Sequence, residues 1–139
     1  MKNDIHDLGL VLDSRVRLIF IESWQEPRVL ETIGSLAVQR AQTWDTWNHL
    51  DGLSRLGFGT DVDDEQDTRD PEIALETVRR SKEDSLYVFC DLHPFLESPR
   101  IVRQLKSLAM SNDVSAPTLI LVSHAVTLPQ ELTRLSAHL

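Results

Sequence analysis

Three short apolar runs constrain the fold of this chain more than any other feature. They are VRLIFIES at 16–23, LYVFCD at 86–91 and APTLILVSHA at 116–125. Each run is apolar almost throughout and rich in β-branched or aromatic residues, which is typical of a strand buried on both faces of a parallel sheet. A fourth segment, TWDTWNHL at 43–50, alternates tryptophan with polar residues, and we interpret it as a further strand.

Segments with a helical spacing of apolar residues separate these strands. They cover 3–14, 23–41, 70–82, 98–113 and 129–139. Ser23 and Glu26 have the spacing of a capping box, which would begin the second helix. Asp70 and Ser98 each stand before a proline, which is typical of a helix start. The glycine-rich segment at 52–60 fits either a hairpin or a loop.

Strands that alternate with helices predict an α/β domain. We therefore expect a three-layer sandwich, in which helices cover both faces of a mostly parallel sheet of about four strands. The length of 139 residues suits a single domain over 1–139 with one core. We expect the last helix, at 129–139, to reach the C-terminus with apolar positions still unpaired. The chain is then either complete or the first part of a longer protein.

The charge is concentrated in one stretch. The formal net charge is −8, and TDVDDEQDTRDPE at 60–72 contributes seven acids against one arginine. We interpret this stretch as an acidic, solvated loop over 60–70, or alternatively as a docking strip for a basic partner. An acidic chain with three lysines, and with arginines scattered along its sequence, is a poor candidate for binding nucleic acid.

The sequence also predicts where the protein resides. No apolar run approaches the ~20 residues that a membrane span needs, and the N-terminus MKNDIHDLGL lacks the apolar core of a secretory signal. We expect a cytoplasmic protein that does not bind membranes. Cys90 is the only cysteine, so it cannot form an internal disulfide, and its place within a strand predicts a buried, inert thiol.

Ligands of an open α/β sheet bind at the carboxyl ends of its strands. Hydrolysis of a nucleoside triphosphate would need glycines, a lysine and a serine or threonine after the first strand. That loop begins SWQEPRVLET, which has no glycine and no lysine, and Pro27 removes an amide donor. Leu92 stands where an acid that polarises water is usual. We therefore expect that this chain alone is not an enzyme and holds no cofactor, although the degenerate rim positions Ser23, Asp91 and Ser123 leave weak nucleotide binding open.

Two other hypotheses for the function of this rim stay open. Asp91, His93 and His124 could form a metal site, and with it a metal-dependent hydrolase, because imidazole and carboxylate suit zinc. A nucleophilic serine is less well supported, since neither Ser23 nor Ser123 stands in a G-x-S-x-G setting. We expect Asp91 to cap the following turn or to bond rim amides rather than to hold a catalytic metal.

Three tryptophans allow a third kind of function, an interaction domain. Trp24, Trp44 and Trp47 would suit an interface, but they could equally pack in the core or cover its edge. We favour packing in the core or at its edge over a role in an interface. If the chain is an interaction domain, we expect a protein partner and a possible oligomer.

The order of these elements resembles half of a P-loop ATPase whose phosphate cradle is missing. More specifically, the chain resembles the N-terminal domain of the AAA-type ATPase family named after a conserved chloroplast open reading frame, found in plastids, cyanobacteria and other bacteria. The matching segments are DLGLVLDSR at 7–15, VRLIFIESWQEPRVLE at 16–31, DPEIALE at 70–76, LYVFCDLHPFLESPRIVRQL at 86–105 and TLILVSHAVTLPQEL at 118–132. The acidic insert at 60–72 is longer than we expect for this family.

The resemblance implies a degenerate P-loop-like domain placed before an AAA module outside this chain. It implies the strand order 2-3-4-1, in which the strand at 86–91 lies between those at 43–50 and 116–125, and the strand at 16–23 borders the last. It also implies a non-catalytic role in assembly, regulation or target contact. The partner would be another protein or the AAA module of the same polypeptide.

Overall fold

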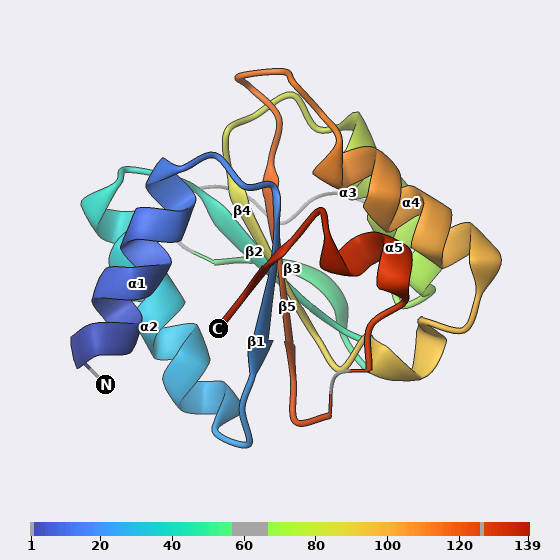
Figure 1. The fold of residues 1–139 in the computed structure, drawn as a ribbon, viewed down its shortest axis with the longest axis horizontal. Helices are drawn as coiled ribbons and strands as arrows, with labels where there is room; N and C mark the ends of the chain where they lie inside the picture. Colours follow the sequence, from blue (N-terminus) through green and yellow to red (C-terminus); the bar gives the residue numbers. More distant parts are fainter. Residues whose placement is uncertain (1, 57–66, 126) are drawn as a thin grey trace.

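The apolar runs and the segment at 43–50 form the centre of one mixed sheet (Figure 1). The computed structural model describes residues 2–56, 67–125 and 127–139, and its six strands follow the order β3-β2-β4-β5-β1-β6. The strands are β1 (Leu18–Glu22), β2 (Trp44–Asn48), β3 (Gly52–Leu56), β4 (Leu86–Cys90), β5 (Thr118–Ser123) and β6 (Ala137–His138). Every residue of β4 and β5 is buried, as expected for strands with helices on both faces.

The predicted sheet of four strands was too small, because it lacked both edge strands. At one edge, β3 pairs antiparallel with β2, so the segment at 52–60 begins as the second strand of a hairpin. At the other edge, β6 pairs in parallel with β1. The observed order therefore differs from the predicted order 2-3-4-1 by one added strand at each edge, whereas the α/β class is confirmed.

The prediction of one helix over 129–139 was wrong. α5 (Gln130–Thr133) is a single turn, and β6 follows it. Backbone bonds hold the last residue against β1: the Leu139 N–H donates to the Phe20 carbonyl at 2.8 Å, and the Glu22 N–H donates to the Leu139 carbonyl at 3.2 Å. The leucine spacing suggested a longer helix. If that helix formed, the backbone groups on the outer edge of β1 would have no partner, and the short β6 pairs with them instead.

Helices cover both faces of the sheet (Figure 1). α1 (Lys2–Asp13) and α2 (Glu26–Gln39) lie on one face, whereas α3 (Pro71–Arg80), α4 (Pro99–Ala109) and α5 lie on the other. Successive residues of each strand point to opposite faces, so that Val88 joins the cluster under α2 and Phe89 joins the cluster under α3 and α4. Within the described ranges, no helix has the length and apolar character needed to cross a bilayer.

Two of the three predicted helix starts are confirmed. Asp70 caps α3 and Ser98 caps α4, each through a bond from its side chain to the first turn. The predicted capping box does not form, because α2 begins at Glu26 and Gln25 is the residue before it. The Ser23 hydroxyl instead accepts a hydrogen bond from the Gln25 N–H at 3.0 Å, which closes the turn between β1 and α2.

The predicted acidic loop at 60–70 lies mainly outside the described residues. Residues 67–70 of this stretch are described and are held by local bonds. The Asp67 carboxylate accepts hydrogen bonds from the backbone N–H and the guanidinium of Arg69 at 2.8–3.0 Å. These bonds lower the pKa of Asp67 to about 2. The indole N–H of Trp47 donates to the Thr68 carbonyl at 2.7 Å, which ties this segment to the core.

Candidate functional site

The carboxyl ends of β1, β4 and β5 meet at one rim of the sheet, where the sequence placed the candidate residues. The Ser23 N–H donates to the Ser123 carbonyl at 2.9 Å, and the Asp91 N–H donates to the Val122 carbonyl at 3.0 Å. Both bonds extend the sheet ladder by one residue beyond the strand ends. The loops after β1 and β4 are therefore fixed against the end of β5, and their side chains face a shared surface.

A serine and a histidine are in direct contact on this rim. The hydroxyl of Ser123 lies 2.6 Å from Nδ1 of His93, which stands in a 3-10 turn (His93–Phe95) after β4. The ring of His124 is perpendicular to that of His93, with centroids 5.1 Å apart. On its other side, His124 stacks against Trp24 at a centroid distance of 4.3 Å. The structure thus joins three predicted rim residues and adds Trp24 to them.

Asp91 has an unusual backbone and a poorly held side chain. Its φ of 60° lies in the left-handed region, which an L-residue other than glycine, asparagine or aspartate seldom adopts. Among the described residues, its exposed carboxylate accepts no hydrogen bond, and Nδ1 of the His93 imidazole lies 4.0 Å from its Oδ1. We expected Asp91 to cap the next turn or to bond rim amides, but no such bond from its side chain is present among the described residues.

The rim does not have the geometry of a catalytic triad. In a triad, the nucleophile and the acid bond opposite nitrogens of the imidazole. Here the Ser123 hydroxyl and the Asp91 carboxylate both approach Nδ1 of His93. The arrangement therefore has no route by which the histidine could take a proton from serine on one side while the acid holds the other nitrogen.

These distances do not support the alternative hypothesis of a metal site at the rim. Nδ1 of His93 is already engaged by the Ser123 hydroxyl. Asp91 and His93 are separated by 4.0 Å, and no group of three His, Cys, Asp or Glu side chains in the described parts of the chain is arranged to hold an ion. Zinc would require ligands at about 2 Å from one point, so the rim would have to rearrange before it could bind the metal.

The turn between β1 and α2 also differs from a phosphate cradle. A helix N-terminus attracts anions through its free N–H groups. In α2 the first turn carries the Glu26 carboxylate, and Pro27 supplies no N–H. Burial, together with the neighbouring Glu26 carboxylate, raises the pKa of the Cys90 thiol. The start of α2 is therefore acidic. Cys90 is buried and its raised pKa keeps the thiol protonated, which agrees with the predicted buried, inert thiol.

The three tryptophans have different environments. Trp47 is fully buried and stacks on Phe89 at a centroid distance of 4.9 Å, and Trp44 is half-buried under α2. Trp24, by contrast, is 81% exposed. The expected packing in the core or at its edge is confirmed for Trp47 and Trp44, whereas Trp24 is exposed on the rim. The sequence signal for this exposure is the position of Trp24 in the loop that follows the apolar strand β1.

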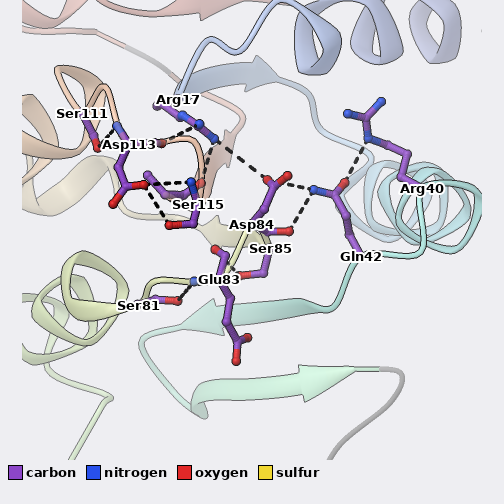
Figure 2. Close-up of polar contacts among 11 residues, drawn as sticks. Arg17, Arg40, Gln42, Ser81, Glu83, Asp84, Ser85, Ser111, Asp113 and Ser115 are labelled. Carbon is purple, nitrogen blue, oxygen red and sulfur yellow. Dashed lines mark hydrogen bonds and ion pairs between the residues drawn. The ribbon is translucent and has the colours of Figure 1, made fainter.

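A second polar cluster, at the amino ends of the strands, was missed by the sequence reading (Figure 2). The buried Arg17 guanidinium donates to the Ala116 carbonyl at 2.7 Å and to the Asp113 carbonyl at 2.9 Å. The Asp84 carboxylate lies 4.0 Å from Arg17 and accepts from the Gln42 amide at 3.2 Å. These groups satisfy one another and join the segments that precede β1, β4 and β5, so the cluster stabilises the fold.

Comparison with known proteins gives a consistent result. A sequence profile of the N-terminal domain of SpoVK-like AAA ATPases matches residues 4–139. The uncharacterized AAA domain-containing protein ycf46 of Pyropia yezoensis is 28% identical over 130 residues, which are 91% of this chain and 26% of that protein. The chain thus spans about a quarter of the length of this relative. No solved structure matches the chain significantly.

Proposed function

Because this chain belongs to the family of SpoVK-like AAA ATPase N-terminal domains, we propose that it is a non-catalytic part of an AAA ATPase that serves assembly, regulation or target contact. The family membership confirms the resemblance that the sequence indicated. The relative from Pyropia yezoensis carries an AAA domain in its name, and the matched region covers 26% of it. An ATP site would then lie in an AAA module outside this chain.

The turn between β1 and α2 carries the non-catalytic part of this proposal. A cradle for triphosphate presents several backbone N–H groups and a lysine to the phosphates. Here the turn has no glycine and no lysine, and the helix that follows begins with Glu26 and Pro27. A carboxylate at this position repels phosphate where a cradle would attract it. We therefore include in the proposal that the chain is a degenerate P-loop-like domain.

The exposed Trp24 is the residue we expect to contact the partner. Tryptophan is enriched among the residues that contribute most to protein–protein affinity, because it buries a large area with little loss of side-chain freedom. Stacking on His124 at 4.3 Å restrains the indole before any partner binds. The partner would be a target protein or the AAA module of the same polypeptide.

Calorimetric titration of the purified chain with Mg-ATP, and separately with zinc, tests the non-catalytic role. Neither ligand should release heat. Binding of ATP at micromolar to sub-millimolar affinity would contradict the proposal and favour a nucleotide-binding module, in which the Trp24–His124 pair stacks the base. Binding of zinc that is lost in Asp91→Asn and in His124→Ala would favour the metal-dependent hydrolase instead.

Titration of the chain with the separately expressed AAA module, or with a target protein, tests the contact surface. Trp24→Ala should weaken the association roughly tenfold or more, as expected for an aromatic anchor. Val38→Ala is the matched control, because Val38 is also exposed but lies in the last turn of α2, away from this rim. Equal effects of the two substitutions would exclude Trp24 as the anchor.

A further inference from the structure

A groove on the outer surface of α3 and α4 gathers arginines that are far apart in the sequence. The two helices pack side by side on one face of the sheet (Figure 1). The groove between them is lined by Glu76, Arg79, Arg100, Arg103, Gln104 and Ser107. Arg100, Arg103 and Ser107 follow the spacing of one helix face, and Arg79 comes from the neighbouring helix. The sequence suggested that the arginines are scattered, but helix packing brings Arg79, Arg100 and Arg103 together.

The positive charge of this surface contrasts with the rest of the chain. α4 carries Arg100 and Arg103 on this face and no aspartate or glutamate, whereas Lys106 lies outside the groove and pairs with Glu131 at 3.8 Å. The chain as a whole has a formal net charge of −8. Two arginines on one face of a helix without acids make this groove more positive than the rest of the acidic chain.

The acids of the groove do not neutralise its arginines. The Glu76 carboxylate is shared, since it accepts from Arg79 at 2.9–3.0 Å and from Arg80 at 3.0 Å. Arg100 is 77% exposed and has only a longer contact, 3.4 Å, with Glu72. Arg103 is exposed, and no carboxylate in the described parts of the chain lies within 4.0 Å of it. Two guanidiniums on one helix face are thus available to further carboxylates.

The side chain of Gln104, at the groove, links α4 to α3. The amide nitrogen of Gln104 donates to the Glu72 carbonyl at 2.9 Å, which fixes the orientation of the side chain. Its oxygen, Oε1, is the buried side-chain atom that has no hydrogen-bond partner among the described residues. Because this atom has almost no exposed area, it belongs to the buried wall of the groove and is not a contact for a ligand.

We propose that the α3–α4 groove binds an acidic segment of a partner polypeptide, with its carboxylates on Arg100 and Arg103. Guanidinium forms paired hydrogen bonds with carboxylate, which favours aspartate and glutamate side chains as the ligands of this groove. A long polyanion such as nucleic acid fits less well, because Glu72 and Glu76 border the groove and the rest of the chain is acidic. This surface is separate from the Trp24 rim, so the two proposals can fail independently.

Fluorescence anisotropy tests the groove with a labelled octapeptide of alternating aspartate and glutamate. The intact chain should bind this peptide, should not bind the same peptide with asparagine and glutamine in place of the acids, and should bind more weakly as salt is added. Arg100→Gln with Arg103→Gln should weaken binding roughly fivefold to tenfold, the sum expected for two exposed ion pairs. Circular dichroism melts confirm that the variant is folded.

Arg28→Gln with Arg134→Gln is the matched control, because both arginines are exposed and lie outside the groove. This variant has the same change of net charge and should keep its affinity within about twofold. An equal loss in both double variants would overturn the proposal, since binding would then follow net charge alone. It would also be overturned by an oligonucleotide of equal charge that binds more tightly than the peptide, or by self-association through the groove in sedimentation velocity.

Discussion

Asp45 and Arg55 face each other across the β2–β3 pair, with Nε of the arginine 3.0 Å from Oδ1 of the aspartate. The Asp45 side chain is 2% exposed and that of Arg55 is 19% exposed. Burial raises the pKa of Asp45, because desolvation of the carboxylate outweighs its hydrogen bond with Arg55. The hairpin at the edge of the sheet therefore depends on a buried charge whose only close cation is Arg55, as far as the described residues show.

Arg55→Ala should lower the free energy of unfolding by roughly 3–5 kcal/mol at neutral pH, because it leaves the Asp45 carboxylate buried without its partner. Urea unfolding measures the change. Arg69→Ala is the control, since it removes a solvent-exposed ion pair with Asp67 and should cost far less. Losses of equal size would mean that the buried pair contributes no more than a surface pair.

The pH dependence of stability gives a second test of Asp45. Its pKa in the folded state is raised above the ordinary value of 3.8, so between these two pKa values the folded chain binds more protons than the unfolded chain. The contribution of Asp45 to stability is therefore fully present below 3.8 and is lost as pH rises through the folded pKa. The stability of the wild type relative to Asp45→Asn should fall as pH rises over this window, in urea unfolding at a series of pH values. A rise would show that pairing with Arg55 dominates over burial.

Two helical glycines should respond in opposite ways to alanine. A Cβ at Gly34 would lie 2.8 Å from Cζ2 of Trp44, whereas a Cβ at Gly9 would meet only Cδ2 of Leu36 at 3.9 Å. Gly34→Ala should lower the free energy of unfolding by about 1–3 kcal/mol, because the rigid indole must move. Gly9→Ala should raise it by about 0.5–1 kcal/mol through helix propensity alone. Thermal unfolding of both variants decides, and a gain in both would mean that Trp44 moves without cost.

Much of the fold was predictable because local rules determine it. The buried strands follow from uninterrupted apolar runs, and the caps at Asp70 and Ser98 follow from short-range chemistry. The edge strands were not predictable in this way. β6 is two residues long, and its pairing with β1 depends on a contact between segments more than a hundred residues apart. Such a strand has no length over which a period can be read.

The candidate site was predictable in position but not in detail. The rule that parallel strands end at one rim placed Asp91, His93, Ser123 and His124 together. The rule gives no side-chain orientation, so the contact of Ser123 with His93 and the stacking of Trp24 on His124 came only from the structure. The arginine groove was missed for a related reason, because its members lie on two helices and only helix packing unites them.

Arg17 should be among the most important charged residues for stability, since its buried guanidinium bonds two backbone carbonyls that lie about a hundred residues away in the sequence (Figure 2). Arg17→Met should lower the free energy of unfolding by roughly 1.5–3 kcal/mol, the range for hydrogen bonds to a charged group. Arg40→Met is the control, because Arg40 pairs with the exposed Asp13 and should cost about 1 kcal/mol or less. Denaturant unfolding at equal ionic strength compares the two, and a smaller loss for Arg17 would mean that water replaces its bonds.

The left-handed backbone at Asp91 separates a structural role from a chemical one. With φ at 60°, glycine is the most favourable residue, and asparagine is tolerated about as well as aspartate. Asp91→Gly should therefore keep or raise the melting temperature, whereas Asp91→Ala should lower the free energy of unfolding by about 1 kcal/mol. Asp91→Asn should leave stability unchanged, because no hydrogen bond to the carboxylate is present among the described residues.

Thermal melts with and without zinc complete the comparison for Asp91. If the carboxylate has no ligand role, zinc leaves the melting temperatures of the wild type and of Asp91→Asn the same. If it holds a metal, the melting temperature of the wild type rises with zinc concentration, and Asp91→Asn abolishes that shift while its metal-free stability stays intact. Loss of stability in Asp91→Asn without zinc would contradict both accounts, since it would mean that the negative charge itself stabilises the turn after β4.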